Sequence, residues 1–354
     1  MEYVASLDHE EILIRRGTRS GVHTIVAVHS TVRGPSLGGC RMWYYGDARA
    51  AIRDAMRLSE GMTFKSAVAG LPLGGGKGVI MLPNDQRRPE GERRRDILMD
   101  FADNVNRMEG RYLTAEDVGI SDDDVAVMSE VTHHVSGLSR ERGGSGDPSP
   151  WTALGVDQAI RVSCERAFGT PDLDGRSICV IGLGHVGAHL ARSLADAGAQ
   201  LVVTDVDNGK KALADELGAR WTEPGSALFE DVDVVAPCAL GGQLDHRSVP
   251  QMRCKVIAGA ANNQLADTSV DGLLAERGIL WAPDFVVNAG GIINISVELD
   301  GEYSETRADE RVRAIADTMR RVYDDVDESG RTPLTAAMEL ARRRLAEARA
   351  GAPA

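Results

Sequence analysis

The chain has 354 residues, of which 43% are hydrophobic and 26% are charged, a balance typical of a globular protein with about two domains. Its net charge of -13 argues against nucleic acid or an anionic membrane as a partner, because both are themselves negative. The five cysteines form no C-x-x-C pair, no stretch of about 18 apolar residues occurs, and the N-terminus lacks the pattern of a signal peptide. We therefore predict a cytoplasmic protein with reduced thiols.

Strand and helix patterns alternate in the first part of the chain, which predicts an α/β domain. The run from Glu11 to Ser30 predicts a hairpin with a turn at Arg19 to Gly21. Apolar residues at helical spacing predict a helix from Asp47 to Met62, with Asp47 as its N-cap and Lys65 near its end. A second helix is predicted from Arg95 to Arg107.

Lys77 follows three successive glycines, Gly74 to Gly76. Glycines lose much backbone entropy on folding, so a run of them is expected where the chain bends unusually or lets a ligand approach. A phosphate-binding P-loop is excluded, because Leu71 stands where that motif needs glycine and Gly78 follows the lysine where it needs Ser or Thr. A glycine turn before a strand that begins at Val79, with an exposed lysine, is the alternative.

The segment from Tyr112 to Gly119 reads as a short apolar strand that runs into two acids. Asp117 at its end is either a helix cap or a catalytic group. The acids from Asp122 to Asp124 predict the first turn of another helix. His133 and His134 have no cysteine or carboxylate at ligand spacing, so no metal site is predicted.

Glycine, serine and proline concentrate between Ser136 and Pro150, which predicts a linker between two domains. We expect a catalytic, substrate-binding domain over residues 1–140 and a dinucleotide-binding domain over residues 141–332. A long charged helix is predicted beyond Arg307, and a last helix, within residues 333–354, is expected to rejoin the first domain.

The second domain begins with a dinucleotide-binding pattern. Four apolar residues from Ile178 precede a G-x-G-x-x-G motif, formed by Gly182, Gly184 and Gly187. In such loops the first glycine permits a tight turn, the second lets a pyrophosphate approach, and the third lets the helix pack on the strand. A second strand ends at Asp205, where an acid bonds the ribose 2′-hydroxyl and repels a 2′-phosphate. The pattern therefore predicts a Rossmann fold that binds NAD.

Three further strands are predicted in this domain, each followed by a loop of small and polar residues: 232–236, 256–258 and 279–281. Ligands of an open parallel sheet bind at the carboxyl ends of the strands, so these loops should line one cleft. The amides best placed for it are Asn262, Asn263 and Asn288. Each is equally well explained as a turn residue beside glycine.

Together these motifs resemble one family. The segments GPSLGGCRMW, GMTFK, LPLGGGK, TAEDVG, GLGHVG, AGAANNQL and APDFVVNAGG occur in the order found in the Glu/Leu/Phe/Val amino-acid dehydrogenases, from Gly34 to Gly291. The chain is most similar to the branched-chain (leucine and valine) members. The resemblance implies reversible, NAD-dependent oxidative deamination of an L-amino acid to a 2-oxo acid and ammonia, by a homo-oligomer with a cleft between the two domains.

The resemblance also implies residue roles. Lys65 binds the substrate carboxylate, Lys77 is the base that activates water, and Asp117 moves protons. Burial and the nearby positive charge of Lys65 would favour the neutral amine that a base needs. The implied cofactor contacts are Gly182, Gly184, Gly187, Asp205, Thr152, Ala239 and Asn262.

The resemblance further implies a substrate pocket formed by Leu37, Gly38, Met62, Ala115, Asn262, Ile292 and Ile295. Leu37 stands where glutamate enzymes carry a lysine, and an apolar wall would leave a glutamate carboxylate unpaired, at a cost of several kcal/mol, order of magnitude. An aliphatic substrate is therefore expected. Leucine, valine and isoleucine are not ranked, because one methylene discriminates by only about 1–3 kcal/mol. The alternatives are a phenylalanine or tryptophan dehydrogenase of the same family and a non-catalytic NAD-binding regulator.

Overall fold

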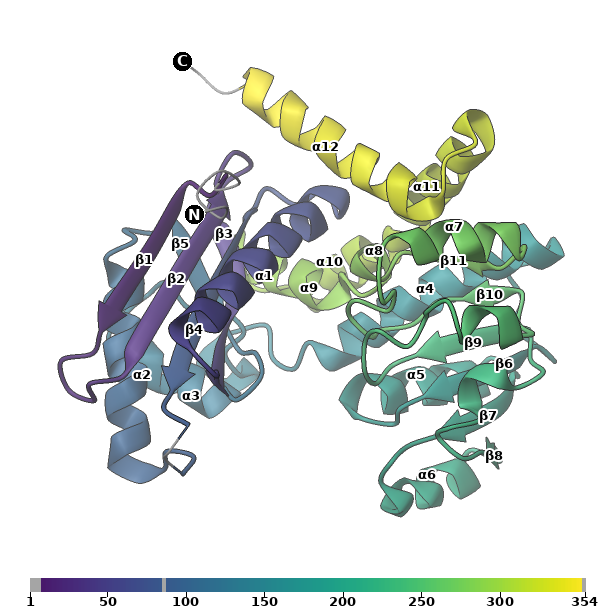
Figure 1. The fold of residues 1–354 in the computed structure, drawn as a ribbon, viewed down its shortest axis with the longest axis horizontal. Helices are drawn as coiled ribbons and strands as arrows, with labels where there is room; N and C mark the ends of the chain where they lie inside the picture. Colours follow the sequence, from purple (N-terminus) through teal and green to yellow (C-terminus); the bar gives the residue numbers. More distant parts are fainter. Residues whose placement is uncertain (1–7, 85–86, 352–354) are drawn as a thin grey trace. The chain divides into compact units, whose positions relative to one another are not determined.

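The structure, a computed structural model, describes residues 8–84 and 87–351, so the ends of the predicted ranges 1–140 and 333–354 lie outside the described residues. The chain divides into two compact units (Figure 1). Unit 1 comprises Met1–Asp147, Ile295–Tyr303 and Ala341–Ala354, and unit 2 comprises Pro148–Asn294 and Ser304–Leu340. Among the described residues, no helix is both long and apolar enough to cross a membrane.

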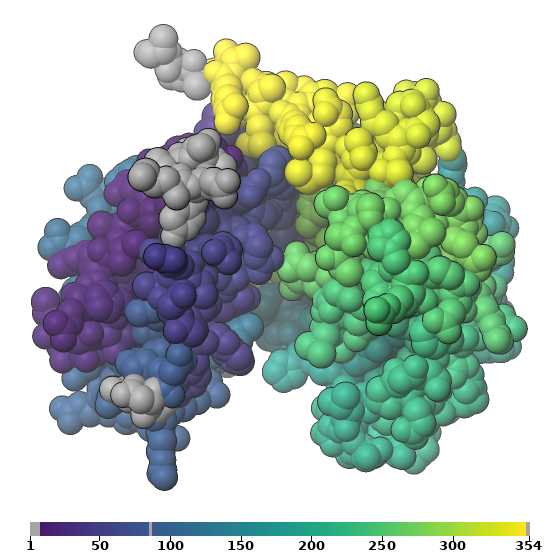
Figure 2. Space-filling model, in the orientation of Figure 1, coloured from purple at the N-terminus to yellow at the C-terminus, as the bar shows by residue number. Residues whose placement is uncertain are grey.

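Unit 1 is built on a five-stranded sheet in the order β1-β2-β4-β3-β5. Its strands are β1 (Glu11–Arg16), β2 (His23–Ser30), β3 (Ser36–Tyr44), β4 (Gly74–Leu82) and β5 (Tyr112–Ala115). β1 and β2 pair antiparallel, which confirms the predicted hairpin, whereas β3 is parallel to both β4 and β5. β1 is an edge strand at the surface of unit 1, purple in Figure 2.

Helices cover both faces of this sheet. They are α1 (Ala48–Val68), α2 (Gly91–Asn106) and α3 (Asp122–Ser129). α1 packs on one face of the sheet, against residues such as Ile25 of β2 and Val79 of β4. The next residues along these strands, Val26 and Ile80, point to the opposite face and pack with Phe101 of α2. The central strands of the sheet are thus covered on both sides, as expected for its parallel part, β4-β3-β5.

The helix starts follow local rules. Asp47 accepts a hydrogen bond from the Ala50 amide at 2.8 Å, which confirms it as the N-cap of α1. Ser121 and Asp124 form a reciprocal capping box at the start of α3. α1 continues past the predicted Met62 to Val68, so Lys65 lies in its last turn.

The glycines before Lys77 lie inside a strand, since β4 begins at Gly74, and the pairing of β2 with β4 shifts by one residue opposite Gly75 and Gly76. The prediction of a bend, or of a turn before a strand at Val79, is therefore wrong. A Cβ at Gly75 would stand 2.1 Å from the Thr63 amide nitrogen of α1, and one at Gly76 would stand 2.5 Å from the Tyr112 ring. The missing side chains let α1 and this ring pack directly on the strand backbone.

Unit 2 is built on a six-stranded parallel sheet in the order β11-β10-β9-β6-β7-β8. Its strands are β6 (Ser177–Ile181), β7 (Gln200–Thr204), β8 (Arg220–Trp221), β9 (Val234–Pro237), β10 (Val256–Ile257) and β11 (Leu280–Trp281). The strands predicted from the apolar runs are confirmed. With unit 1, this sheet confirms the predicted fold class: an N-terminal α/β domain and a C-terminal Rossmann-type domain.

The α-helices that follow α3 are α4 (Ser149–Phe168), α5 (His185–Asp196), α6 (Lys211–Glu216), α7 (Ser269–Glu276), α8 (Asp284–Val287), α9 (Gly290–Leu299), α10 (Glu305–Arg313), α11 (Ile315–Ser329) and α12 (Pro333–Gly351). The charged helix predicted beyond Arg307 is in fact two helices, α10 and α11, which meet at Ala314. α9 and α12 each contribute residues to both units.

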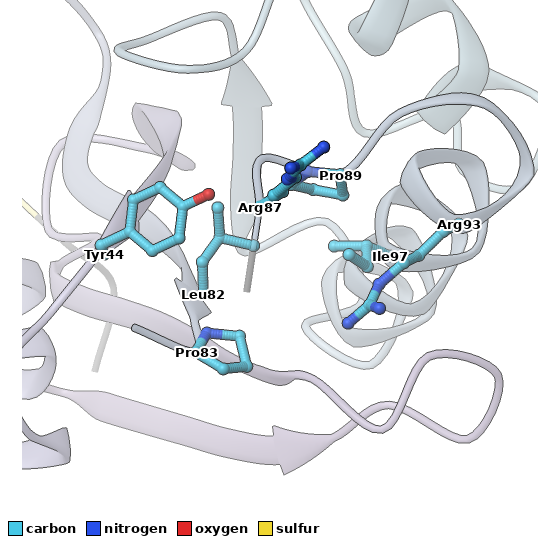
Figure 3. A pocket seen from close by; sticks show the side chains of 7 residues that line it. All are labelled: Tyr44, Leu82, Pro83, Arg87, Pro89, Arg93 and Ile97. Atoms are coloured by element: carbon cyan, nitrogen blue, oxygen red, sulfur yellow. The ribbon is translucent and has the colours of Figure 1, made fainter. Parts of the chain in front are cut away.

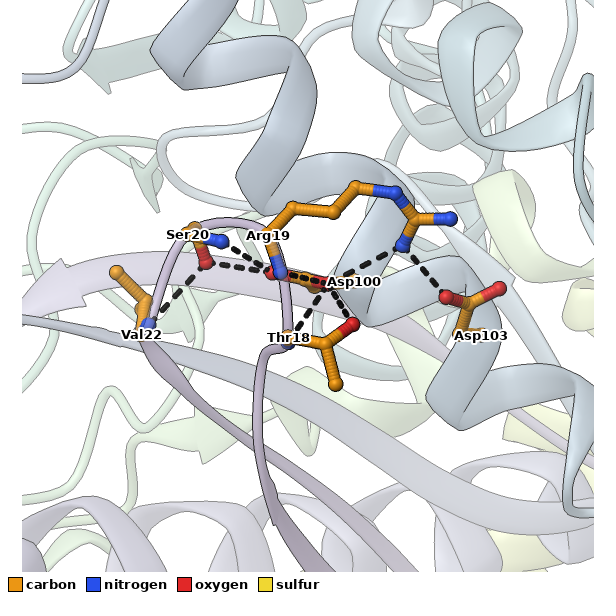
Figure 4. A network of polar contacts seen from close by, with 6 residues as sticks. All are labelled: Thr18, Arg19, Ser20, Val22, Asp100 and Asp103. Carbon is orange, nitrogen blue, oxygen red and sulfur yellow. Dashed lines mark hydrogen bonds and ion pairs between the residues drawn. The ribbon is translucent and has the colours of Figure 1, made fainter.

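A buried carboxylate fixes the β1–β2 turn on α2 (Figure 4). Asp100, whose side chain is 1% exposed, accepts hydrogen bonds from the backbone amides of Thr18, Arg19 and Ser20 at 2.8–3.2 Å. The Ser20 hydroxyl and the Arg19 guanidinium donate to it as well. Burial raises the pKa of Asp100, but hydrogen bonds from Ser20 and Arg19 outweigh it and hold the pKa below its ordinary value.

We expect Asp100→Asn to lower the free energy of unfolding by about 2–3 kcal/mol, because the turn amides lose a charged acceptor. The loss should shrink as the pH falls below about 4, since a carboxylate with a lowered folded pKa stabilises only while it is ionised. Urea unfolding at several pH values measures both effects. Asp103→Asn is the matched control: its carboxylate is 38% exposed and bonds Arg19 alone among the described contacts, so a loss as large as that of Asp100→Asn would contradict the argument.

Candidate active site

Lys77 is buried in unit 1 and paired with Asp117. Its side chain is 6% exposed, and its Nζ lies 2.9 Å from Asp117 Oδ2. An exposed lysine after a glycine turn is therefore excluded. A buried ammonium needs a partner of opposite charge, and the pair places a transferable proton between an amine and a carboxylate.

Arg41, on β3, contacts the same oxygen of this carboxylate as Lys77 does. Its Nε donates to Asp117 Oδ2 at 2.9 Å, and its Nη1 donates to Asp54 Oδ2 of α1 at 3.0 Å. The Tyr45 hydroxyl donates to that Asp54 oxygen at 2.8 Å. Sequence reasoning missed Arg41; the available signal was a charged residue two positions after Gly39 in an otherwise apolar strand, which puts it on the face of Lys77.

Two cations set the ionisation of Asp117. Burial raises the pKa of this carboxyl, but the charges of Lys77 and Arg41 and their hydrogen bonds outweigh burial, so its pKa lies below its ordinary value. Asp117 is therefore a carboxylate at neutral pH.

Lys77 and Asp117 come from either side of β3 and meet across it. Adjacent strands lie about 4.8 Å apart, so two side chains flanking a third strand meet only if that strand leaves room. β3 leaves room because it carries Gly39 at this level, opposite Ala115. A Cβ at Gly39 would stand 2.3 Å from the Glu116 carbonyl oxygen and 2.8 Å from Asp117 Cβ.

The predicted substrate residues of unit 1 lie on β3, on β5 and on α1. Leu37 and Ala115 are 1% and 4% exposed, and strand alternation and register put both on the face of Gly39. A Cβ at Gly38 would stand 1.8 Å from the Gly76 carbonyl oxygen, so this position holds β3 close to β4. Met62 and Lys65 are half-buried on α1. The convergence of Lys65 with Lys77 stays a prediction.

Two predicted pocket residues lie on α9. Ile292, in unit 2, is 7% exposed and Ile295, in unit 1, is 9% exposed. The Ile295 Cδ1 lies 3.8 Å from where a Cβ would stand at Gly137.

The glycine loop of unit 2 joins β6 to α5. Gly182 has a φ of 99°, which favours glycine. A Cβ at Gly187 would stand 1.9 Å from the Gly182 carbonyl oxygen, whereas one at Gly184 would meet nothing within 4 Å. Asp205, which follows β7, accepts a hydrogen bond from the Leu183 amide at 2.7 Å. The loop is thus tightly packed at both ends, open in the middle, and tied to the acid of the neighbouring strand.

Loops from other strands meet the glycine loop at the carboxyl edge of the sheet. Ala239 follows β9 and packs directly on Gly182: a Cβ at Gly182 would stand 2.7 Å from the Ala239 Cβ. Asn262, after β10, accepts a hydrogen bond from Asn288 Nδ2 at 2.9 Å. A Cβ at Gly241 would stand 2.3 Å from the Asn262 carbonyl oxygen, so these two loops touch.

Thr152 lies in the first turn of α4 and donates its hydroxyl to the Pro148 carbonyl at 3.0 Å. Its Oγ1 is 3.0 Å from where a Cβ would stand at Gly291. Thr152 thus lies beside the start of α9 in unit 2.

A shallow depression at the far end of β4 carries no comparable chemistry (Figure 3). It has no room for a bound water molecule, since its cavity volume is about 0 Å³. It is lined by Tyr44, Leu82, Pro83, Arg87, Pro89, Arg93 and Ile97.

A parallel sheet with a glycine loop, an acid after the second strand, and polar loops along the same edge defines a dinucleotide-binding α/β protein. Residues 9–134 match the family model of the Glu/Leu/Phe/Val dehydrogenase dimerisation domain, and residues 203–351 match that of the glutamate/leucine/phenylalanine/valine dehydrogenases. Residues 156–243 match the NAD-binding domain of the D-isomer-specific 2-hydroxyacid dehydrogenases. The chain belongs to the Glu/Leu/Phe/Val dehydrogenase family.

Individual relatives match over nearly the full length. Leucine dehydrogenase of Bacillus cereus is 42% identical over 346 residues, which are 98% of this chain and 93% of the relative. Valine dehydrogenase of Streptomyces virginiae is 41% identical over 96% of this chain and 95% of its own. The crystal structure of L-tryptophan dehydrogenase from Nostoc punctiforme superposes with a TM-score of 0.84 at 37% identity and covers 98% of both chains.

We expect Gly39→Ala to lower kcat/KM about 100-fold, because the new Cβ displaces Asp117 from Lys77 by a fraction of an ångström or more. Dinucleotide binding to unit 2 should be unchanged, which separates lost geometry from lost folding. Gly46→Ala is the matched control, since a Cβ there meets nothing within 4 Å. Equal activities of the two variants would contradict the inference that Gly39 lets the side chains of Lys77 and Asp117 meet across β3.

Proposed function

We propose that the protein catalyses the reversible NAD-dependent oxidative deamination of an aliphatic L-amino acid, leucine, valine or isoleucine, to the 2-oxo acid, ammonia and NADH. The observation that carries this proposal is the buried Lys77–Asp117 pair, with 2.9 Å between the amine and the carboxylate, in a chain of this family. The pair supplies the base and the proton carrier that imine hydrolysis requires.

The roles follow from the chemistry of each group. Lys65 holds the substrate carboxylate as a cation. NAD, when bound, accepts the hydride from the substrate α-carbon. Lys77, as a neutral amine, takes a proton from the water that attacks the resulting imine, which gives a carbinolamine. Asp117 carries that proton from Lys77 to the substrate nitrogen. Lys77 then takes the remaining hydroxyl proton as the C–N bond breaks, so that ammonia and the 2-oxo acid leave.

The cofactor-binding residues proposed for unit 2 are Gly182, Gly184, Gly187, Asp205, Thr152, Ala239 and Asn262. The space above Gly184, where no atom lies within 4 Å of a Cβ, fits the close approach of a pyrophosphate. The Asp205 carboxylate favours a ribose 2′-hydroxyl over a 2′-phosphate, which supports NAD over NADP. Asn262 serves both the nicotinamide and the substrate.

The proposed substrate pocket combines Leu37, Gly38, Met62, Ala115, Ile292 and Ile295 with Asn262. Its apolar lining disfavours glutamate. An aromatic substrate is the second candidate, because the Nostoc punctiforme L-tryptophan dehydrogenase is 40% identical over 98% of this chain.

The larger arrangement is also proposed: a catalytic domain over residues 1–140 with the helix within 333–354, an NAD-binding domain over residues 141–332, and a substrate cleft between them. A cytoplasmic homo-oligomer fits the family model, whose N-terminal part is named a dimerisation domain.

The direct test is NADH appearance with leucine, isoleucine, valine, phenylalanine, tryptophan and glutamate, with NADP as a cofactor control. We expect the highest kcat/KM with a branched-chain substrate, a smaller value with the aromatic ones and no turnover with glutamate. A preference for tryptophan would establish the second candidate. Absence of activity with all six would mean a non-catalytic NAD-binding regulator.

Lys77→Ala should lower kcat about 100-fold to 10,000-fold, the range supplied by a positioned acid or base. NADH binding, measured by fluorescence titration, should be unchanged. Lys255→Ala is the control, because Lys255 is an exposed lysine of unit 2. Near-normal turnover by Lys77→Ala would contradict the assigned base.

A further inference from the structure

Three potential metal ligands meet in unit 1, on elements far apart in the chain. Asp8 precedes β1, His29 lies on β2 and Glu60 lies on α1. One ligand atom from each residue lies within 4.8 Å of the ligand atoms of the other two. No other three His, Cys, Asp or Glu residues come this close together among the described residues. No spacing rule connects positions 8, 29 and 60, so the sequence predicts no metal site here.

His29 presents a nitrogen lone pair to this group. Its Nδ1 lies 2.8 Å from the Thr63 hydroxyl, and that hydroxyl donates its own proton to the Ser59 carbonyl at 3.3 Å. When the hydroxyl accepts the Nδ1 proton of the neutral ring, Nε2 is the nitrogen with a lone pair for a cation. Nε2 lies 3.4 Å from Asp8 Oδ2. A partner that fixes the tautomer and the orientation of the ring is typical of metal-binding histidines.

His9 points independently to a cation. Its side chain is 3% exposed, and its Nδ1 lies 3.3 Å from Asp8 Oδ1 but has no hydrogen-bond partner among the described residues. Its Nε2 lies 2.9 Å from the Ser59 hydroxyl and 3.1 Å from the Met56 carbonyl oxygen, so that nitrogen is held inside unit 1. Nδ1 is therefore the nitrogen that faces Asp8, and in its unprotonated form it is placed to bind a cation beside that carboxylate.

A cavity of about 300 Å³ opens beside the group. Asp8 and His29 line it, together with Glu10 and with Arg342 and Arg349 of α12. The side chain of Asp8 is 64% exposed. An ion therefore has a path to the ligands, and the cavity leaves space for water to complete its coordination.

We propose that Asp8, His29 and Glu60 bind a divalent transition-metal ion of the Zn²⁺ class, with His9 Nδ1 in reach as a further donor. One imidazole nitrogen and two carboxylates suit Zn²⁺ or Co²⁺, whereas Mg²⁺ and Ca²⁺ take oxygen ligands. The bound ion joins the segment at Asp8 to β2 and to α1. Its role is to stabilise unit 1, and it takes no part in the reaction.

The probe is Co²⁺, whose visible absorption reports nitrogen and oxygen ligands in a low-symmetry site. The protein is the full chain without a histidine tag, stripped with a chelator. We expect one Co²⁺ per chain, displaced by one equivalent of Zn²⁺ and unaffected by millimolar Mg²⁺. The temperature of unfolding should rise with added Zn²⁺, because the ion binds the folded state.

Asp8→Asn and Glu60→Gln, both at exposed side chains, should each weaken Co²⁺ binding by at least about tenfold. Each should also abolish the Zn²⁺-dependent rise in unfolding temperature while leaving metal-free turnover unchanged. Glu92→Gln, at an exposed carboxylate on α2, should bind like the unmodified chain. Absence of saturable Co²⁺ binding, displacement by Mg²⁺, or unchanged affinity in both variants would overturn the proposal.

Discussion

The constraint on which the catalytic unit depends is close approach between backbones where side chains are missing. Gly75 lets Thr63 of α1 rest directly on β4, and Gly39 lets Asp117 approach β3. In both places a Cβ would come within 2.3 Å of a backbone atom. Ordering these glycines costs conformational entropy. The burial of the side chains around them offsets that cost in the free energy of folding.

That approach produces a row of alternating charges. Lys77, Asp117, Arg41 and Asp54 follow one another at 2.9–3.0 Å. A single buried charge is strongly destabilising, but each member here has a neighbour of opposite sign. The row ends at Arg57, whose side chain is 53% exposed, so the network runs from a buried lysine to solvent. It therefore fixes the position of the Asp117 carboxylate and keeps it ionised without leaving an unpaired charge.

The parts that the sequence predicted are those set by contacts within a few residues. The hairpin, the Asp47 cap and the loop at Gly182 depend on neighbours in the chain, so their patterns are visible in it. The partners of Arg41 and the role of Gly75 depend on which elements pack together. A charged residue in an apolar strand marks Arg41 as unusual, but the sequence does not show that it pairs with Asp117 and Asp54. Nor does it show that Asp8, His29 and Glu60 lie close together. The glycine run was misread because a strand interior usually disfavours glycine, and here packing overrides that preference.

α1 links the two charged regions of unit 1. Asp54 on this helix pairs with Arg41 at the candidate active site, and Lys65 lies in its last turn. Between them, Thr63 contacts both Gly75 and His29. A helix that rests on bare strand backbone has little freedom to slide, because packed cores do not deform continuously. The packing of Thr63 against Gly75 and His29 therefore holds the C-terminal half of α1 against β2 and β4.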